Sequence, residues 1–354
     1  MNDEQRTMNR RPFRPPLLHD HMDGCKTLLP ILPELFRLAN EPFPFSPSPE
    51  RYAEEIKLLF RNAQIGIVEK FRNTTGVMQC SEALRLAAYA YTTERAKEGY
   101  TYCEMTIAPQ YHTRGGLYET DVVRALIEGI VMGEKKFPEI EVDIIFTIGR
   151  EAPPEEGVRL VEAAKFCDRD YVVGIGLVCD EAAYPPERHA DAFRLAKRLG
   201  FKTTVHAGEW VNLPPDTPHP GRDRAKLLQN MRTAIVGMGA DRIGHAIPLA
   251  YDEELIRLVT DREIGIEGCP GSNLTSCLIP DMAYLKIRDL LAAKVMYSMN
   301  PDDDLFLPDL DETFALCDSE YHFVENERRL LELNAWATRF GRRKEYPAPF
   351  EQKT

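Results

Sequence analysis

Short apolar runs rich in Val, Ile and aromatic residues alternate along this chain with longer stretches whose apolar positions recur at helical spacing. The short runs predict strands, which we place at 16–21, 102–108, 142–148, 172–178, 203–206, 242–245, 264–269 and 295–298. The stretches between them predict helices at 121–136, 155–166, 186–199, 224–238, 252–261 and 283–293. This alternation is typical of repeated βα units and a parallel sheet. It predicts a single-domain (β/α)8 TIM barrel over residues 1–354.

A long insertion, residues 28–99, separates the first two predicted strands. It begins with a Pro-rich stretch and continues with helical periodicity that includes 52–60. Two interpretations stay open: an extra helical layer over the barrel, or a lid, because loops at the active end of a barrel carry function. After the last predicted strand, 311–342 predicts further helices and 343–354 a tail, which we expect to be loosely held from Tyr346.

Composition and charge narrow the classes of protein. A chain of 354 residues with 44% hydrophobic and 28% charged residues is typical of a globular protein. Its net charge of −12 argues against a nucleic-acid or anionic-membrane surface. No apolar run approaches the ~20 residues of a membrane span, and we see no secretory signal, so we expect a cytoplasmic protein. The eight cysteines form no C-x-x-C pair, which is typical of reduced, mostly buried thiols.

Candidate chemistry gathers where the predicted strands end. His19 and His21 stand two positions apart, and in a strand such residues point to one face, as chelation of one ion requires. Other candidates follow later strands: His206, Glu209, His245, Asp302 and Asp303. The carboxyl ends of barrel strands meet at one mouth, so we expect these side chains to converge there.

This set of residues matches the needs of a mononuclear zinc site, which takes three or four N or O ligands and keeps a position for water. Three imidazoles and one carboxylate are available from His19, His21, His206 and Asp302. The other candidates would then act around a bound water, whose pKa zinc lowers toward neutrality. The fourth predicted strand ends without a lysine that could bridge two metals, which favours one ion per chain.

A single histidine at a strand end is more often a hydrogen-bonded structural residue than a ligand. The joint placement of the candidates therefore carries the hypothesis, rather than any one residue. The remaining histidines fall in predicted loops or helices, and we interpret them as surface residues: His112, His189, His219 and His322.

In these residues and the motifs around them, the chain resembles the adenosine deaminase family of metal-dependent amidohydrolases. It covers nearly the whole predicted barrel and rests on motifs that stand in the family's order: HDHMDG at 19–24, HAGE at 206–209, RIGH at 242–245, CPGSN at 269–273 and NPDD at 300–303. The resemblance implies one zinc ion per chain, held by His19, His21, His206 and Asp302. Asp302 is also expected to contact the bound water.

The resemblance also implies roles for the remaining candidates. Glu209 would protonate N1 of a purine while His245 orients the hydroxide that attacks C6 and expels ammonia. For substrate binding, Asp303 would hydrogen-bond N7 and Asp23 the ribose 5′-hydroxyl. Ring protonation and an activated water together make C6 open to attack.

Three departures from the family pattern bear on the substrate. Cys179 stands where the family commonly has glycine, so it adds a side chain at the pocket wall beside the backbone N–H expected to bind N3. The segment after Glu209 is expanded at 212–220, which puts His206 and His245 39 positions apart (245 − 206). Of the apolar lid residues that cover the substrate, only Phe71 is easily aligned.

The function implied is zinc-dependent hydrolytic deamination of a 6-aminopurine nucleoside, adenosine or 2′-deoxyadenosine, with that small molecule and water as the partners. Alternatives are a deaminase of adenine or of a 5′-modified adenosine, a hydrolase of an ester or lactone, and a non-catalytic binding member of the family. Asp23 favours the nucleoside, because adenine-specific relatives tend to carry glutamate there. The oligomeric state and the metal actually loaded stay open.

Overall fold

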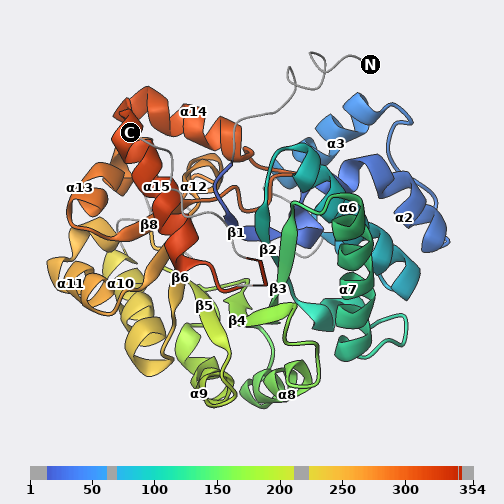
Figure 1. Ribbon diagram of the computed structural model, residues 1–354, viewed down its shortest axis with the longest axis horizontal. Helices are drawn as coiled ribbons and strands as arrows, with labels where there is room; N and C mark the ends of the chain where they lie inside the picture. Colours follow the sequence, from blue (N-terminus) through green and yellow to red (C-terminus); the bar gives the residue numbers. More distant parts are fainter. Residues whose placement is uncertain (1–13, 62–69, 211–222, 342, 345–354) are drawn as a thin grey trace.

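The computed structural model describes residues 14–61, 70–210, 223–341 and 343–344. Within these ranges eight parallel strands pair in the order of the sequence, and helices surround them (Figure 1). The strands are β1 (Leu17–His21), β2 (Tyr102–Ile107), β3 (Glu141–Gly149), β4 (Val172–Val178), β5 (Lys202–Ala207), β6 (Arg242–His245), β7 (Gly265–Gly268) and β8 (Met296–Met299). Every boundary lies within one residue of the predicted one, and the predicted (β/α)8 barrel is confirmed.

Helices follow the strands as predicted, with local differences. They are α7 (Glu119–Lys136), α8 (Pro154–Ala164), α9 (Ala190–Arg198), α10 (Arg224–Arg232), α11 (Glu253–Asp261) and α13 (Ile287–Ala292). A 3-10 turn, η4 (Pro186–His189), precedes α9, and a π-helical turn, η6 (Thr233–Gly237), follows α10. The helix predicted at 283–293 is interrupted, because Lys286 adopts a left-handed conformation with φ of 48° between η8 (Met282–Leu285) and α13.

The insertion after β1 forms several helices: η1 (Met22–Gly24), η2 (Lys26–Ile31), α2 (Leu32–Leu38), α3 (Pro49–Arg61), α5 (Arg72–Thr75) and α6 (Ser81–Lys97). Helix α6 packs along α7 on the outside of the barrel, while α2 and α3 lie toward its edge (Figure 1). Phe71, just before α5, contacts the ring of Phe306 at a centroid distance of 5.2 Å, so this part of the insertion reaches the loop after β8. That the insertion acts as a lid stays a prediction.

The C-terminal part of the chain forms α14 (Leu310–Tyr321) and α15 (Glu325–Thr338), within the range predicted as helical. The structure describes two residues of the predicted tail, and both are anchored at the amino ends of the strands. The Nε atom of Arg343 lies 2.9 Å from Asp143 Oδ1, and the Lys344 backbone N–H donates to Glu141 Oε2 over 2.7 Å. Positions 345–354 lie outside the described residues.

The sheet closes between its first and last strands through few hydrogen bonds. Asp20 and Asp302 form an isolated parallel bridge, in which the backbone N–H of Asp302 donates to the His19 carbonyl over 3.3 Å. A side chain completes the closure, because Asn300 Oδ1 accepts from the Leu18 backbone N–H over 2.9 Å. This seam between β1 and β8 carries several of the predicted site residues.

Two histidines predicted to lie on the surface are buried, which corrects that interpretation. His112 ends η3 (Pro109–His112), and its Nδ1 atom lies 2.9 Å from the Met78 carbonyl oxygen. His189 ends η4, and its Nε2 atom lies 3.0 Å from the Arg150 carbonyl oxygen. Both rings fold inward because they satisfy backbone carbonyls that would otherwise be buried without a donor. His322 is exposed as predicted, and His219 lies outside the described residues.

Two further features concern the cysteines and the helices. All eight cysteines are free: four are buried, three half-buried, and Cys277 is exposed. None of the helices in the described part of the chain combines the length and the apolar character that crossing a bilayer requires.

Candidate metal centre and active site

Side chains from the ends of β1, β5 and β6 and from the loop after β8 meet at the mouth of the barrel. One ligand atom from each of His19, His206, His245 and Asp302 lies within 4.8 Å of the others, and all four residues are buried. His21 joins them, with its Nε2 atom 3.2 Å from His206 Nε2 and 3.3 Å from Asp302 Oδ1. The structure therefore brings together all four predicted metal ligands. It also places His245 within 4.8 Å of His19, His206 and Asp302.

The donors fit a bound cation. The Nδ1 atom of His19 lies 2.9 Å from Glu267 Oε2, so Nδ1 carries the proton and Nε2 turns its lone pair into the site, where it has no hydrogen-bond partner. A carboxylate behind a histidine is the arrangement that fixes the tautomer of metal-binding imidazoles. His21 and His206 turn Nε2 atoms toward each other over 3.2 Å, and two lone pairs at that distance need a proton or a metal between them.

The backbone is shaped for this convergence. A Cβ atom at position 244 would lie 2.8 Å from His19 Cε1, so only glycine lets His19 approach β6 this closely. His245 and Asp302 have φ values of 63° and 67°. Such left-handed residues cost about 1–2 kcal/mol each and are concentrated at functional sites.

Glu209 and His245 form a second part of the site, next to the cluster. His245 Nε2 lies 3.7 Å from Glu209 Oε1, and its Nδ1 lies 3.0 Å from Asn273 Oδ1. Because a carbonyl oxygen can only accept, Nδ1 donates to Asn273 and Nε2 faces Glu209. Burial raises the pKa of Glu209 above its usual value, against the opposing effect of His245. A carboxyl group with a raised pKa is suited to carry a proton near neutral pH.

The loop that carries Glu209 is held by one buried carboxylate. Glu181, just beyond β4, accepts hydrogen bonds from the backbone N–H groups of Gly208 and Glu209 over 2.9 and 2.8 Å. Its Oε1 atom also accepts from Asn230 Nδ2 over 2.8 Å. These bonds fix where the Glu209 side chain begins. The expanded segment, 212–220, lies outside the described residues.

The residues predicted to bind substrate surround the cluster. Asp23 accepts a hydrogen bond from Thr75 Oγ1 over 2.9 Å, which ties η1 to α5. Asp303 is half-buried, and its Oδ1 atom is shielded from solvent without a hydrogen-bond partner. It packs so closely against Gly24 that a Cβ there would lie 1.7 Å from Oδ1.

Cys179 and Phe71 contribute apolar or weakly polar groups. Cys179 follows β4 with a φ of 76°, a conformation that favours glycine, and its Sγ atom lies 3.7 Å from the Tyr111 hydroxyl. That hydroxyl donates to Glu151 Oε2 over 2.8 Å. Phe71 packs on Phe306 rather than on any of the metal-binding candidates.

Several residues that organise the site had no role assigned from the sequence: Glu181, Glu267, Ser272 and Asn273. Ser272 donates to Asp302 Oδ2 over 2.7 Å and so orients that carboxylate. Glu267 is a charged residue inside an apolar predicted strand. A buried carboxylate needs a partner, so this position could have been recognised from the sequence as part of the site. Ser272 and Asn273 belong to the CPGSN motif at 269–273, whose sequence alone assigns no role to either residue.

Known proteins resemble this chain in sequence. The family profile described as adenosine deaminase matches residues 17–346. An adenosine deaminase of Mycolicibacterium gilvum (strain PYR-GCK) is 30% identical over 309 residues, which are 82% of this chain and 79% of the relative. An adenosine deaminase of Mycobacterium ulcerans (strain Agy99) is 29% identical over the same length and shares of the two chains.

Solved structures share the fold. An adenine deaminase from Arthrobacter aurescens superposes with a TM-score of 0.77 at 20% identity, covering 93% of this chain and 94% of that one. An amidohydrolase from Burkhoderia ambifaria with bound Zn gives a TM-score of 0.78 at 22% identity, covering 97% and 90% of the two chains.

The barrel and its cluster of imidazole and carboxylate donors define a metal-dependent amidohydrolase. The chain belongs to the adenosine deaminase family. It is accordingly a hydrolytic deaminase that acts on the amidine C–N bond of a purine.

Proposed function

We propose that this protein is a zinc-dependent adenosine deaminase, which hydrolyses adenosine or 2′-deoxyadenosine to inosine or 2′-deoxyinosine and ammonia. One observation carries the proposal: the half-buried carboxyl group of Glu209 lies 3.7 Å from His245, beside a cluster of imidazole and carboxylate donors. The names of the relatives at about 30% identity support the choice of substrate.

Four residues would hold the zinc ion in this proposal: His19, His21, His206 and Asp302. Zinc in such a donor set supplies Lewis-acid activation of water near neutral pH. We assign His245 to the water rather than to the ion, because its Nδ1 is held by Asn273 and its Nε2 faces Glu209.

Glu209 and His245 would have different roles in the reaction. His245 orients the attacking water toward C6, while Glu209 gives a proton to N1 of the purine. Addition of water at C6 and loss of the 6-amino group as ammonia leave the 6-oxo product. The raised pKa of Glu209, caused mainly by burial, supports its role as the donor.

Substrate orientation would come from Asp303, Asp23 and the backbone at Cys179. N7 of the purine is an acceptor, so a contact with Asp303 requires that carboxyl group in its protonated form. Thr75 occupies Asp23 Oδ2, and Oδ1 remains to accept from the ribose 5′-hydroxyl. A 5′-phosphate at this point would face a negative charge, which favours nucleosides over nucleotides.

The test is ammonia release from adenosine, 2′-deoxyadenosine, adenine, AMP and 5′-methylthioadenosine, compared by kcat/KM. We expect the two unmodified nucleosides to be the best substrates. Adenine as the best substrate would move the function to base deamination, and AMP or the 5′-thioether would move it to 5′-modified nucleosides. Absence of ammonia from all five, in protein with a full complement of metal, would support the non-catalytic alternative.

A further inference from the structure

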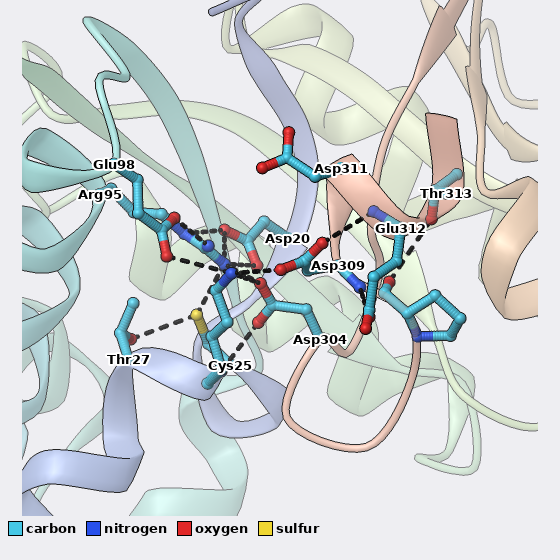
Figure 2. Close-up of polar contacts among 12 residues, drawn as sticks. Asp20, Cys25, Thr27, Arg95, Glu98, Asp304, Asp309, Asp311, Glu312 and Thr313 are labelled. Carbon is cyan, nitrogen blue, oxygen red and sulfur yellow. Dashed lines mark hydrogen bonds and ion pairs between the residues drawn. The ribbon is translucent and has the colours of Figure 1, made fainter. Parts of the chain in front are cut away.

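A network of charged groups joins the segments that carry the metal-binding candidates, and Figure 2 shows its members Asp20, Arg95 and Asp304. Its centre is Arg95 of α6, whose side chain is 1% exposed. The guanidinium group donates two hydrogen bonds to Asp20, from Nε to Oδ2 and from Nη2 to Oδ1, each 3.0 Å long. Nη2 also lies 2.9 Å from Asp304 Oδ2. One cation therefore joins two fully buried carboxylates.

The two carboxylates belong to the segments that supply metal-binding candidates. Asp20 stands between His19 and His21 in β1, and successive strand residues point to opposite faces, so Asp20 points away from the mouth while both histidines point into it. Asp304 lies two positions beyond Asp302. Arg95 consequently contacts residues that stand one or two positions from three of the four proposed ligands.

These segments meet at the seam where the barrel closes between β1 and β8. The backbone joins them through the bridge between Asp20 and Asp302 and through the Leu305 N–H, which donates to the Gly24 carbonyl over 2.8 Å. Asp304 extends the connection, since its Oδ1 atom accepts from the Lys26 backbone N–H over 2.7 Å. The contacts of Arg95 with Asp20 and Asp304 thus connect β1 to the segment after β8, where the sheet itself has only an isolated bridge.

Three further side chains contact Arg95 or Asp20. Tyr91 donates to Asp20 Oδ2 over 2.7 Å, and Glu98 Oε2 lies 2.9 Å from Arg95 Nη1. Cys25 Sγ lies 2.8 Å from Arg95 Nη2. The oxygens and sulfur of Asp20, Cys25 and Asp304 lie within 4.8 Å of one another, but the guanidinium occupies the place that a second cation would take.

We propose that Arg95 is a positioning residue of the metal centre, which sets the spacing between the histidines of β1 and Asp302 by holding Asp20 and Asp304 across the seam. Buried ion pairs contribute little net stability compared with apolar residues of similar volume, so stability alone is a weak reason for this network. A ligand shifted by a fraction of an ångström changes metal affinity and geometry. The inference rests on the proposed metal site.

The experiment compares the zinc dissociation constant of metal-free wild type with those of Arg95→Lys and Asp304→Asn, measured by competition with a chromogenic chelator. Lysine keeps the positive charge but cannot make both hydrogen bonds to Asp20. Asparagine keeps the size of Asp304 but removes its negative charge. We expect each variant to bind zinc about 10- to 100-fold more weakly, the usual range for partners of metal ligands. In the double variant the two effects should be less than additive, because both act through one contact.

The matched control is Arg343→Met, which breaks the contacts of Arg343 with Asp143 and Glu134 at the opposite end of the barrel. It should lower the denaturant midpoint of the metal-free protein and leave zinc affinity unchanged. The visible absorption of the cobalt(II) form, which reports coordination geometry, should change for Arg95→Lys and not for Arg343→Met. If Arg95→Lys folds and binds zinc as tightly as wild type with an unchanged cobalt spectrum, the positioning role is wrong.

Two outcomes separate this inference from the proposed function. Wild-type protein that binds zinc tightly while the Arg95 and Asp304 variants bind equally well refutes only the positioning role. Wild-type protein that binds no zinc refutes the proposed metal centre, and the inference falls with it. Should Arg95→Lys fail to fold, Asp304→Asn alone decides, since it leaves the Arg95–Asp20 pair in place.

Discussion

The Nδ1 atom of His19 lies 2.9 Å from the carboxylate of Glu267, a residue 248 positions further along the chain. The other oxygen of that carboxylate accepts from Thr204 Oγ1 over 2.8 Å and lies 2.5 Å from Arg242 Nε. Three strands thus fix the ring of one proposed metal ligand. The orientation of His19 is set before any metal binds, which lowers the conformational cost of coordination.

The first prediction concerns this carboxylate. Glu267→Gln keeps the shape of the side chain but weakens its hold on the His19 N–H and on Arg242. We expect zinc affinity to fall about 10- to 100-fold. Zinc titration of the metal-free variant against a chelator measures the change. Thr204→Val, which removes a neutral partner of the same carboxylate, should have a smaller effect; equal affinities for wild type and Glu267→Gln would contradict the role.

The second prediction concerns metal content. The purified protein should hold about one zinc ion per chain and lose activity when a chelator removes it. His19→Ala and Asp302→Ala should lose zinc and activity together. Because zinc binds the folded state, a concentration 1,000 times its dissociation constant should add about 4 kcal/mol to the free energy of unfolding. Metal analysis that finds two ions per chain would refute the mononuclear site.

Glu209→Gln tests proton transfer separately from metal binding. The change preserves size and hydrogen bonding but removes the titratable group, so zinc content should stay at the wild-type level. Loss of a positioned acid typically lowers the rate about 10²–10⁴-fold, and we expect kcat for adenosine to fall in that range. Glu151→Gln, another carboxylate near the mouth, is the control and should stay within a few-fold of wild type. A similar result for Glu209→Gln would exclude it as the proton donor.

The fourth prediction concerns the sugar. Asp23→Ala should reduce kcat/KM for adenosine about 10- to 100-fold, as expected for a lost hydrogen bond to a charged group, while zinc content is unchanged. Thr75→Val removes the donor to Asp23 Oδ2 and should give a milder loss in the same direction. Adenine lacks the ribose, so its residual turnover should not respond to either change. An equal loss for adenine and adenosine would show that Asp23 acts on the fold or the metal instead.

Much of the fold could be predicted from the sequence, because parallel barrel strands are buried on both faces and therefore read as continuous apolar runs. The residue at the end of each run was equally visible. His245 ends its strand and His206 stands one residue before the end of its own, and the common direction of the strands places such residues at one mouth. The motifs then pointed to the family, which the comparisons show.

Only the tertiary structure decided which buried partners hold those side chains. Glu267 reaches His19, and Arg95 reaches both Asp20 and Asp304, across separations that no local pattern encodes. The burial of His112 and His189 was hidden for the same reason, since loop histidines look alike whether or not they find a carbonyl inside. Periodicity reports which face of an element is buried, whereas the pairing of buried polar groups depends on how distant elements pack, and this is fixed only when the barrel closes.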